Sequence, residues 1–190
     1  MWKPRSLIIE RKGMRMKTVY LIGGTMGVGK TTVCQELKKE LERSVFLDGD
    51  WCWDANPFQV TEETKKMVLE NICFLLNQFI RCSAYEHIIF CWVMHEQEIL
   101  DTILEHIDTA GCRVKTISLV CSPQTLIGRL KQDIAAGIRD ESVMARSVAC
   151  IPMYRLLNTT KIETDGKSVR QIALEIIANE PDSVRQKASP

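Results

Sequence analysis

The chain has 190 residues, the length of one α/β domain with a buried core. Its 25 Lys and Arg against 24 Asp and Glu give a formal net charge of +1. A net charge this small excludes a strong overall positive potential that would attract nucleic acid or an anionic membrane. The longest apolar runs, such as Ile88–Met94, fall far short of the roughly 20 residues of a membrane-spanning helix.

The cysteines and the N-terminus indicate the compartment. The eight cysteines form no C-x-x-C pair, and no histidine lies at the spacing of a zinc site with them. The N-terminus has only three consecutive apolar residues, Leu7–Ile9, where a secretory signal needs about 7 to 15. We therefore expect reduced thiols, no metal bound through sulfur, and a cytosolic protein.

Short β-branched runs alternate with amphipathic stretches after a basic arm at residues 1–17. The runs predict five strands, in chain order Val19–Ile22, Val45–Leu47, Ile88–Val93, Val114–Val120 and Lys161–Thr164. Such alternation is typical of β-α units wound into a parallel sheet. We expect an α/β domain over residues 18–178 and a polar tail over residues 179–190.

Helices are predicted between the strands from apolar spacing and capping residues. The first carries Val33, Leu37 and Leu41 on one face. The second begins near Thr61, and its expected buried stripe is Met67, Ile72, Leu75, Phe79 and Ile80. The third stops at Gly111, since glycine is favoured just after a helix.

The C-terminal third carries three further predicted helices. Ser122–Pro123 is an N-cap followed by proline at the first helical position, and it opens a helix to about Gly137. A second helical stretch covers about Glu141–Leu157. Ser168 and Gln171 form a capping box for the last helix.

A phosphate-binding loop lies between the first strand and the first helix. Residues 24–31 satisfy the Walker A pattern G-x-x-x-x-G-K-[ST], with the members Gly24, Thr25, Met26, Gly27, Val28, Gly29, Lys30 and Thr31. Backbone N–H groups and the helix dipole then point at one anion. We expect Lys30 to bridge the β- and γ-phosphates of ATP and Thr31 to hold Mg²⁺. The alternative is an ordinary glycine-rich turn.

Two acids follow the second strand in the segment Leu47–Trp53. Side chains two apart on an extended strand project to the same side, so Asp48 and Asp50 are predicted to face one space. Ligands of open α/β sheets collect at the carboxyl ends of the strands. We expect Asp48 to hold a Mg²⁺-bound water and Asp50 to accept the proton of an acceptor hydroxyl. The alternative is a solvated turn, because Asp-Gly is a common turn signal.

The segments GGTMGVGKTT and LDGDW resemble the small-molecule kinases of the P-loop class, which include gluconate, shikimate and adenylylsulfate kinases and chloramphenicol phosphotransferase. The resemblance spans about residues 18–178. It implies the P-loop NTPase fold with a five-stranded parallel sheet in the order 2-3-1-4-5, Mg-ATP as donor and a small-molecule acceptor near the second strand. By position, Thr32 joins the nucleotide-binding residues, Asp50 matches the acceptor-side acid and Asp48 the metal-side acid.

The third strand departs from the nucleoside monophosphate kinases, because Ile89–His95 has no Asp at the usual Walker B position. Gluconate-kinase-like members also lack that acid, so more of the metal role falls on Asp48. The missing acid also argues against a motor of the AAA type. A GTPase is not supported either, because the sequence has no N-K-x-D motif.

The resemblance further implies an arginine-bearing lid, at about residues 129–150, that closes over the phosphates and excludes water. Arg129 matches the arginine that packs near the adenine and phosphates. Arg139, beside Gly137, suits a mobile lid and a catalytic role, and Arg146 is a third candidate. The alternative for all three is a solvated helix face.

Aromatic residues cluster after the acid pair, and one histidine follows the third strand. The cluster consists of Trp51, Trp53, Pro57 and Phe58, and it is interpreted either as an acceptor pocket or as packing under a loop. His95 is a candidate contact for the acceptor. The chain is thus predicted to be an ATP-dependent small-molecule kinase, with a nucleoside or nucleotide kinase and a non-catalytic ATP-binding module as alternatives. Acceptor and oligomeric state stay open.

Overall fold

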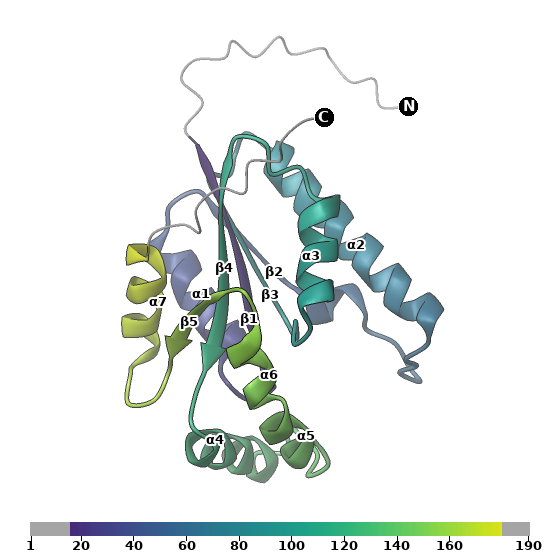
Figure 1. The fold of residues 1–190 in the computed structure, drawn as a ribbon, viewed down its shortest axis with the longest axis vertical. Helices are drawn as coiled ribbons and strands as arrows, with labels where there is room; N and C mark the ends of the chain where they lie inside the picture. Colours follow the sequence, from purple (N-terminus) through teal and green to yellow (C-terminus); the bar gives the residue numbers. More distant parts are fainter. Residues whose placement is uncertain (1–15, 180–190) are drawn as a thin grey trace.

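The computed structural model describes residues 16–179, which form a five-stranded sheet with helices on both faces (Figure 1). Neighbouring strands pair in the order β2-β3-β1-β4-β5, and every pair is parallel. The strands are β1 (Lys17–Gly24), β2 (Ser44–Asp48), β3 (His87–Trp92), β4 (Cys112–Val120) and β5 (Thr160–Glu163). The expected fold and strand order are confirmed. The predicted basic arm and polar tail lie almost wholly outside the described residues.

The helices connect the strands as expected for β-α units. They are α1 (Lys30–Glu40), the short 3₁₀ helix η1 (Gly49–Cys52), α2 (Glu62–Arg81), α3 (Gln97–His106), α4 (Pro123–Ala135), α5 (Val143–Ala149), α6 (Ile151–Leu156) and α7 (Val169–Ala178). The caps predicted at Thr61, Ser122 and Ser168 are present, because each side chain accepts from the backbone N–H three residues on. No helix of the described part is long and apolar enough to cross a membrane.

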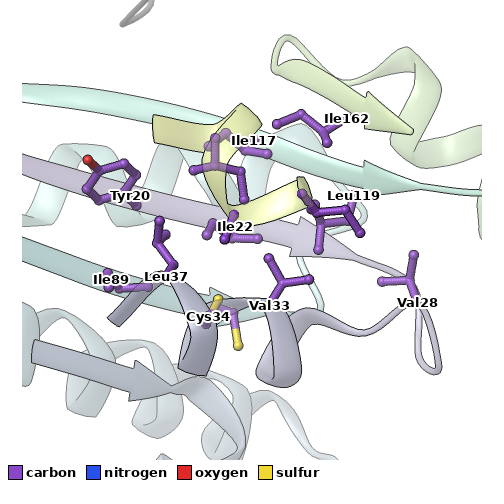
Figure 2. Close-up of a cluster of buried hydrophobic side chains, with 14 of the residues drawn as sticks. Tyr20, Ile22, Val28, Val33, Cys34, Leu37, Ile89, Ile117, Leu119 and Ile162 are labelled. Carbon is purple, nitrogen blue, oxygen red and sulfur yellow. The ribbon is translucent and has the colours of Figure 1, made fainter. Parts of the chain in front are cut away.

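One core lies between the sheet and the helices α1 and α7. Figure 2 shows Val33 and Leu37 of α1 pointing toward Ile22 of β1 and its neighbours on β3 and β4. Each fully buried aliphatic side chain of this kind stabilises the fold by about 1.5–3 kcal/mol. Val28 belongs to the same cluster, so the phosphate-binding loop is fixed to the core that carries it.

The second core lies on the opposite face, under α2 and α3 (Figure 1). The buried residues of α2 are Val68, Ile72, Cys73, Leu76 and Ile80. The predicted stripe was therefore wrong in part, because Met67 is 41% exposed and Leu75 and Phe79 are only partly buried. Residues four apart lie on the same face of a helix, and the buried residues Val68, Ile72, Leu76 and Ile80 have this spacing. Met67 lies outside this row and faces solvent.

The end of α3 differs from the sequence prediction. The helix ends at His106 rather than at Gly111. The Asn77 side chain of α2 donates to the His106 carbonyl at 2.9 Å and accepts from the Asp108 N–H at 2.7 Å, which stabilises this early end. Gly111, with a φ of 73°, instead turns the chain into β4.

The helix predicted over Glu141–Leu157 is two helices, α5 and α6, which meet at Cys150. Pro152 explains the break, because it lacks the N–H that would bond to Val148 and continue the ladder of α5. Both helices and α4 lie at the carboxyl end of the sheet (Figure 1). The expected lid is therefore a set of short helices.

Two lysines of the strands bind the ends of helices. Lys17, the first residue of β1, donates to the Ile80 carbonyl of α2 at 2.6 Å, and Lys115 of β4 donates to the Ile177 carbonyl of α7 at 2.9 Å. Cations are favoured there because the last carbonyls and the dipole are negative. Lys17 was assigned to the N-terminal arm, and it belongs to the domain instead.

Candidate active site

The phosphate-binding loop connects β1 to α1 at the carboxyl end of the sheet. Gly27 and Gly29 have φ of 80° and 103°, which L side chains rarely adopt. A Cβ on Gly27 would also lie 2.6 Å from a methyl carbon of Leu130, so α4 packs directly on this turn. The loop predicted from the Walker A pattern is thus built between a strand, a helix and the predicted lid.

Lys30 lies within this loop. Its ammonium donates to the Gly24 carbonyl at 2.9 Å and to the Thr25 carbonyl at 3.3 Å. Burial lowers the pKa of Lys30, and the negative Asp50 and Asp48 oppose that shift. The site therefore holds a desolvated cation that an anionic ligand would stabilise.

Thr31 and Asp48 meet although they are distant in the sequence. The Thr31 hydroxyl donates to Asp48 Oδ2 at 2.7 Å, and Asp48 is only 5% exposed at the end of β2. Hydroxyl and carboxylate oxygens are the ligands that Mg²⁺ prefers. The described residues contain no group of three His, Cys, Asp or Glu that could enclose a metal. The pair thus fits a Mg²⁺ that keeps waters and takes its other ligands from phosphates.

Asp50 does not lie on an extended strand, so the geometric reason given for its position was wrong. It belongs to η1, because the Asp48 side chain accepts the Asp50 N–H at 3.2 Å and turns the chain. Asp50 still lies close enough to Asp48 and Lys30 to interact with both electrostatically. Burial and then Asp48 raise the pKa of Asp50, while Lys30, Trp92 and Arg139 oppose the shift.

Trp92 and Gly49 were not identified from the sequence. The indole of Trp92, at the end of β3, lies so close to Gly49 that a Cβ there would be 2.4 Å from the indole Cγ. The pairing of Asp48 with Cys91 across β2 and β3 sets this contact. The indole lowers the pKa of Asp50 through hydrogen bonding. Trp92 therefore contacts the turn that carries Asp50 and bonds to the Asp50 carboxylate.

The predicted lid arginines have different surroundings. Arg129 donates to the Val28 carbonyl at 2.9 Å and to the Thr164 hydroxyl at 3.0 Å, so it ties α4 to the phosphate-binding loop and to the end of β5. Arg139 bonds to Asp133 at 2.9 Å and acts electrostatically on Lys30 and Asp50. Arg146 is exposed on α5.

Contacts that no sequence signal identified hold α5 and α6 against β1 and the phosphate-binding loop. The buried Thr25 hydroxyl donates to the Ser147 carbonyl of α5 at 2.7 Å. Tyr154 of α6, 1% exposed, packs against Gly23 of β1, 3.5 Å from the point where a Cβ would lie. Burial raises the pKa of Tyr154 above its ordinary range, so the phenol stays neutral. Thr25, which is predicted to belong to the nucleotide cradle, thus also contacts α5.

The predicted aromatic cluster is two separate pairs. Trp51 packs edge-on to Phe46 at 5.3 Å between ring centroids, and Trp53 packs on Phe58 at 4.6 Å. Trp51 and Phe58 are 59% and 60% exposed, so both pairs present ring surface to solvent. His95 places Nε2 3.6 Å from the Glu96 carboxylate, and its buried Nδ1 has no partner among the described residues.

A shallow hollow of about 470 Å³ lies along α1 and the start of α7. It is lined by Thr31, Thr32, Gln35, Glu36, Lys39 and Val169. Thr32, expected to bind nucleotide, thus borders open space rather than the core.

Known proteins resemble this chain in sequence. The model of the family described as AAA domain matches residues 21–146, which include the loop, both acids and all three lid arginines. The chain is 28% identical over 171 residues to a shikimate kinase of Bacillus cytotoxicus, across 85% of this chain and 97% of the relative.

Solved structures show the same fold. The tunicamycin resistance protein of Deinococcus radiodurans superposes with a TM-score of 0.68 at 19% identity, over 86% of this chain and 95% of that one. A gluconokinase from Sinorhizobium meliloti superposes with a TM-score of 0.65 at 17% identity, over 86% and 91%. The chain belongs to the AAA domain family, in the group of P-loop small-molecule kinases that its motifs resemble.

Proposed function

We propose that this protein transfers the γ-phosphate of ATP, bound with Mg²⁺, to a hydroxyl group of a small molecule. One observation carries the proposal: Asp50 lies close enough to Lys30 and Asp48 to interact with both electrostatically, beside a Walker A loop. A protein that only binds ATP does not need this second acid. The names of the relatives, a shikimate kinase and a gluconokinase, support the same class of reaction.

The nucleotide is proposed to bind with its phosphates in the loop. Lys30 would contact the β- and γ-phosphates, and the backbone N–H groups of the loop would hold the remaining oxygens. The hollow beside Thr32 and Val169 offers space for the nucleoside part. Mg²⁺ held by Thr31 and Asp48 would neutralise charge on the phosphates.

The acceptor is proposed to react on the side of Asp50. The acceptor oxygen forms the bond to the γ-phosphorus, the bond from that phosphorus to the β–γ bridging oxygen breaks, and ADP leaves. The hydroxyl proton passes to the Asp50 carboxylate, whose raised pKa brings it nearer to neutral pH than an ordinary aspartate. Arg129 would fix the lid on the loop, and Arg139 would add positive charge near the phosphates and close out water.

A labelled-ATP transfer screen tests the proposal. Purified protein is incubated with γ-labelled ATP, Mg²⁺ and single acceptors from sugars, sugar acids, nucleosides, nucleotides and antibiotics. Label is expected in one class of acceptor, in amounts that depend on Mg²⁺ and disappear when the metal is chelated. Tight ATP binding with no labelled product from any acceptor would favour the non-catalytic alternative, and label in nucleotides alone would favour a nucleotide kinase.

Arg139→Ala is expected to lower transfer and to raise ATP hydrolysis relative to transfer, because a poorly closed lid admits water that competes with the acceptor. Free phosphate and labelled acceptor are measured in the same reaction. Arg113→Ala is the matched control, since Arg113 is exposed at the start of β4, at the opposite end of the sheet. If Arg139→Ala changes neither the transfer rate nor the ratio of hydrolysis to transfer, Arg139 only pairs with Asp133 and has no part in the reaction.

Gly49→Ala is expected to reduce transfer by roughly tenfold or more, because the new Cβ lies 2.4 Å from Trp92 and must displace either the indole or η1 with Asp50. Overpacking of this kind also costs about 1–3 kcal/mol of stability. Gly128→Ala is the control, since nothing lies within 4 Å of its added Cβ and alanine favours the interior of α4. Thermal melts and transfer rates of both variants are compared. A fully active and stable Gly49→Ala would contradict the role given to this contact.

A further inference from the structure

The segments on both sides of Asp50 and those around β3 contribute acids but no Lys or Arg. Residues 44–64 and residues 82–112, which contain β2, η1, β3 and α3, have no Lys or Arg. The acids at the end of β2, in η1, in the loop to α2, in the first turn of α2 and just after β3 are Asp48, Asp50, Asp54, Glu62, Glu63 and Glu96. Lys30 and Arg139 act on Asp50 itself, so an anionic acceptor group that points away from them, toward these segments, would meet repulsion that no cation of the segments offsets.

The nearest cations are already used by other groups. Lys65 in the first turn of α2 bonds to Glu62 at 2.9 Å, and Lys66 lies 3.9 Å from Glu70. The pKa of Lys65 is raised first by Glu62 and also by Glu96, so the start of α2 faces the segment after β3. Lys30 donates to the Gly24 carbonyl of the phosphate-binding loop and Arg139 bonds to Asp133, and both are proposed to face the phosphates of ATP.

Aromatic rings supply the other surface of this region. Trp92 lies against Gly49 next to Asp50, and Trp53 packs with Trp92 on the core under α2. The Trp53 ring contacts Phe58, which is 60% exposed. The loop that leads into α2 lies toward the same end of the sheet as the lid (Figure 1). Ring faces bind apolar or ring-shaped ligands, while a few polar groups orient them.

We infer that the acceptor is a hydroxyl compound that has no anionic group and presents an apolar ring face. The inference rests on the proposed kinase function and specifies the acceptor for the same site. It separates this protein from kinases of sugar acids and of nucleotides. The rings would contact the ring of the acceptor, and Asp50 would receive its hydroxyl.

Matched acceptor pairs test the charge of the acceptor. Each acid is offered beside an uncharged form of the same skeleton: gluconate beside glucitol, shikimate beside its methyl ester, and a nucleoside monophosphate beside its nucleoside. With the transfer assay above, we expect at least a tenfold higher kcat/KM for the uncharged member of any pair that reacts. A preference for the acid in every reactive pair would overturn the inference and leave the kinase function standing. Transfer to no acceptor, with ATP bound, would instead overturn the kinase function.

Two phenylalanine variants test the ring surface. Phe58→Ala is expected to raise KM for the best acceptor several-fold while the ATP affinity and the thermal midpoint stay unchanged, because an exposed ring contributes little to the core. Phe74→Ala is the matched control, since Phe74 is 63% exposed and lies on α2 twelve residues beyond Glu62, roughly 18 Å along the helix. An equal KM for the acceptor in Phe58→Ala and wild type would contradict the claim that the acceptor presents an apolar ring face to these aromatic residues.

Discussion

Lys30→Met is expected to lower phosphate transfer by roughly 10²–10³-fold while the fold stays intact, because the change removes a positive charge from the β- and γ-phosphates. The structure adds a reason for the intact fold. Burial lowers the pKa of Lys30, so an ammonium at this position is desolvated, and an apolar side chain of similar length does not incur that cost. The thermal midpoint of the free variant is expected to equal or exceed that of wild type.

The control for this variant lies on the same helix. Lys38→Met removes an exposed lysine of α1 that does not line the hollow. Its transfer rate is expected to stay near that of wild type, since the loss of an exposed surface lysine changes little. ATP must also stabilise wild type against heat more than it stabilises Lys30→Met. Wild-type turnover in Lys30→Met would mean that the loop does not hold the reacting phosphates.

Asp50→Asn and Asp48→Asn are expected to fail in different ways. Asp50→Asn keeps nearly the same shape but cannot accept a proton, so ATP affinity survives while transfer falls by roughly 10²-fold or more. Asp48→Asn weakens the oxygen pair with Thr31, so Mg²⁺-dependent ATP binding weakens and added Mg²⁺ partly restores the rate. ATP affinity with and without Mg²⁺, and transfer at several Mg²⁺ concentrations, separate the two variants.

The pH profile gives a second measurement for Asp50. A proton acceptor works in its ionised form, and burial together with Asp48 raises the pKa of Asp50. The rate should therefore fall on the acid side at a higher pH than an ordinary aspartate, near 3.9, would give. Asp50→Asn should lose this limb.

The same shift has a consequence for stability with a definite sign. The native state holds the proton of Asp50 more tightly than the unfolded state, so its contribution to stability is lost as pH rises through the native pKa. At neutral pH Asp50→Asn should therefore melt no lower than wild type. Identical behaviour of the two aspartate variants, or full activity in Asp50→Asn, would return the non-catalytic alternative to first place.

The sequence by itself determined those elements that depend on residues close together in the chain. The Walker A loop is contiguous, the strands are short apolar runs, and the caps at Thr61, Ser122 and Ser168 each depend on residues three apart. The parallel sheet followed from the alternation of these elements, and its strand order from the resemblance of two segments to P-loop kinases.

Only the tertiary structure decided how distant residues meet. Asp50 is a local exception: it was expected on a strand, but the bond from its N–H to the Asp48 side chain two residues before it competes with strand pairing and forms η1. The approach of Trp92 to Gly49 depends on the register of β2 with β3, and the bonds of Arg129 depend on where α4 packs. The contacts of Trp92 and Arg129 join residues more than thirty positions apart, so no local pattern encodes them, and they are fixed only when the two cores close.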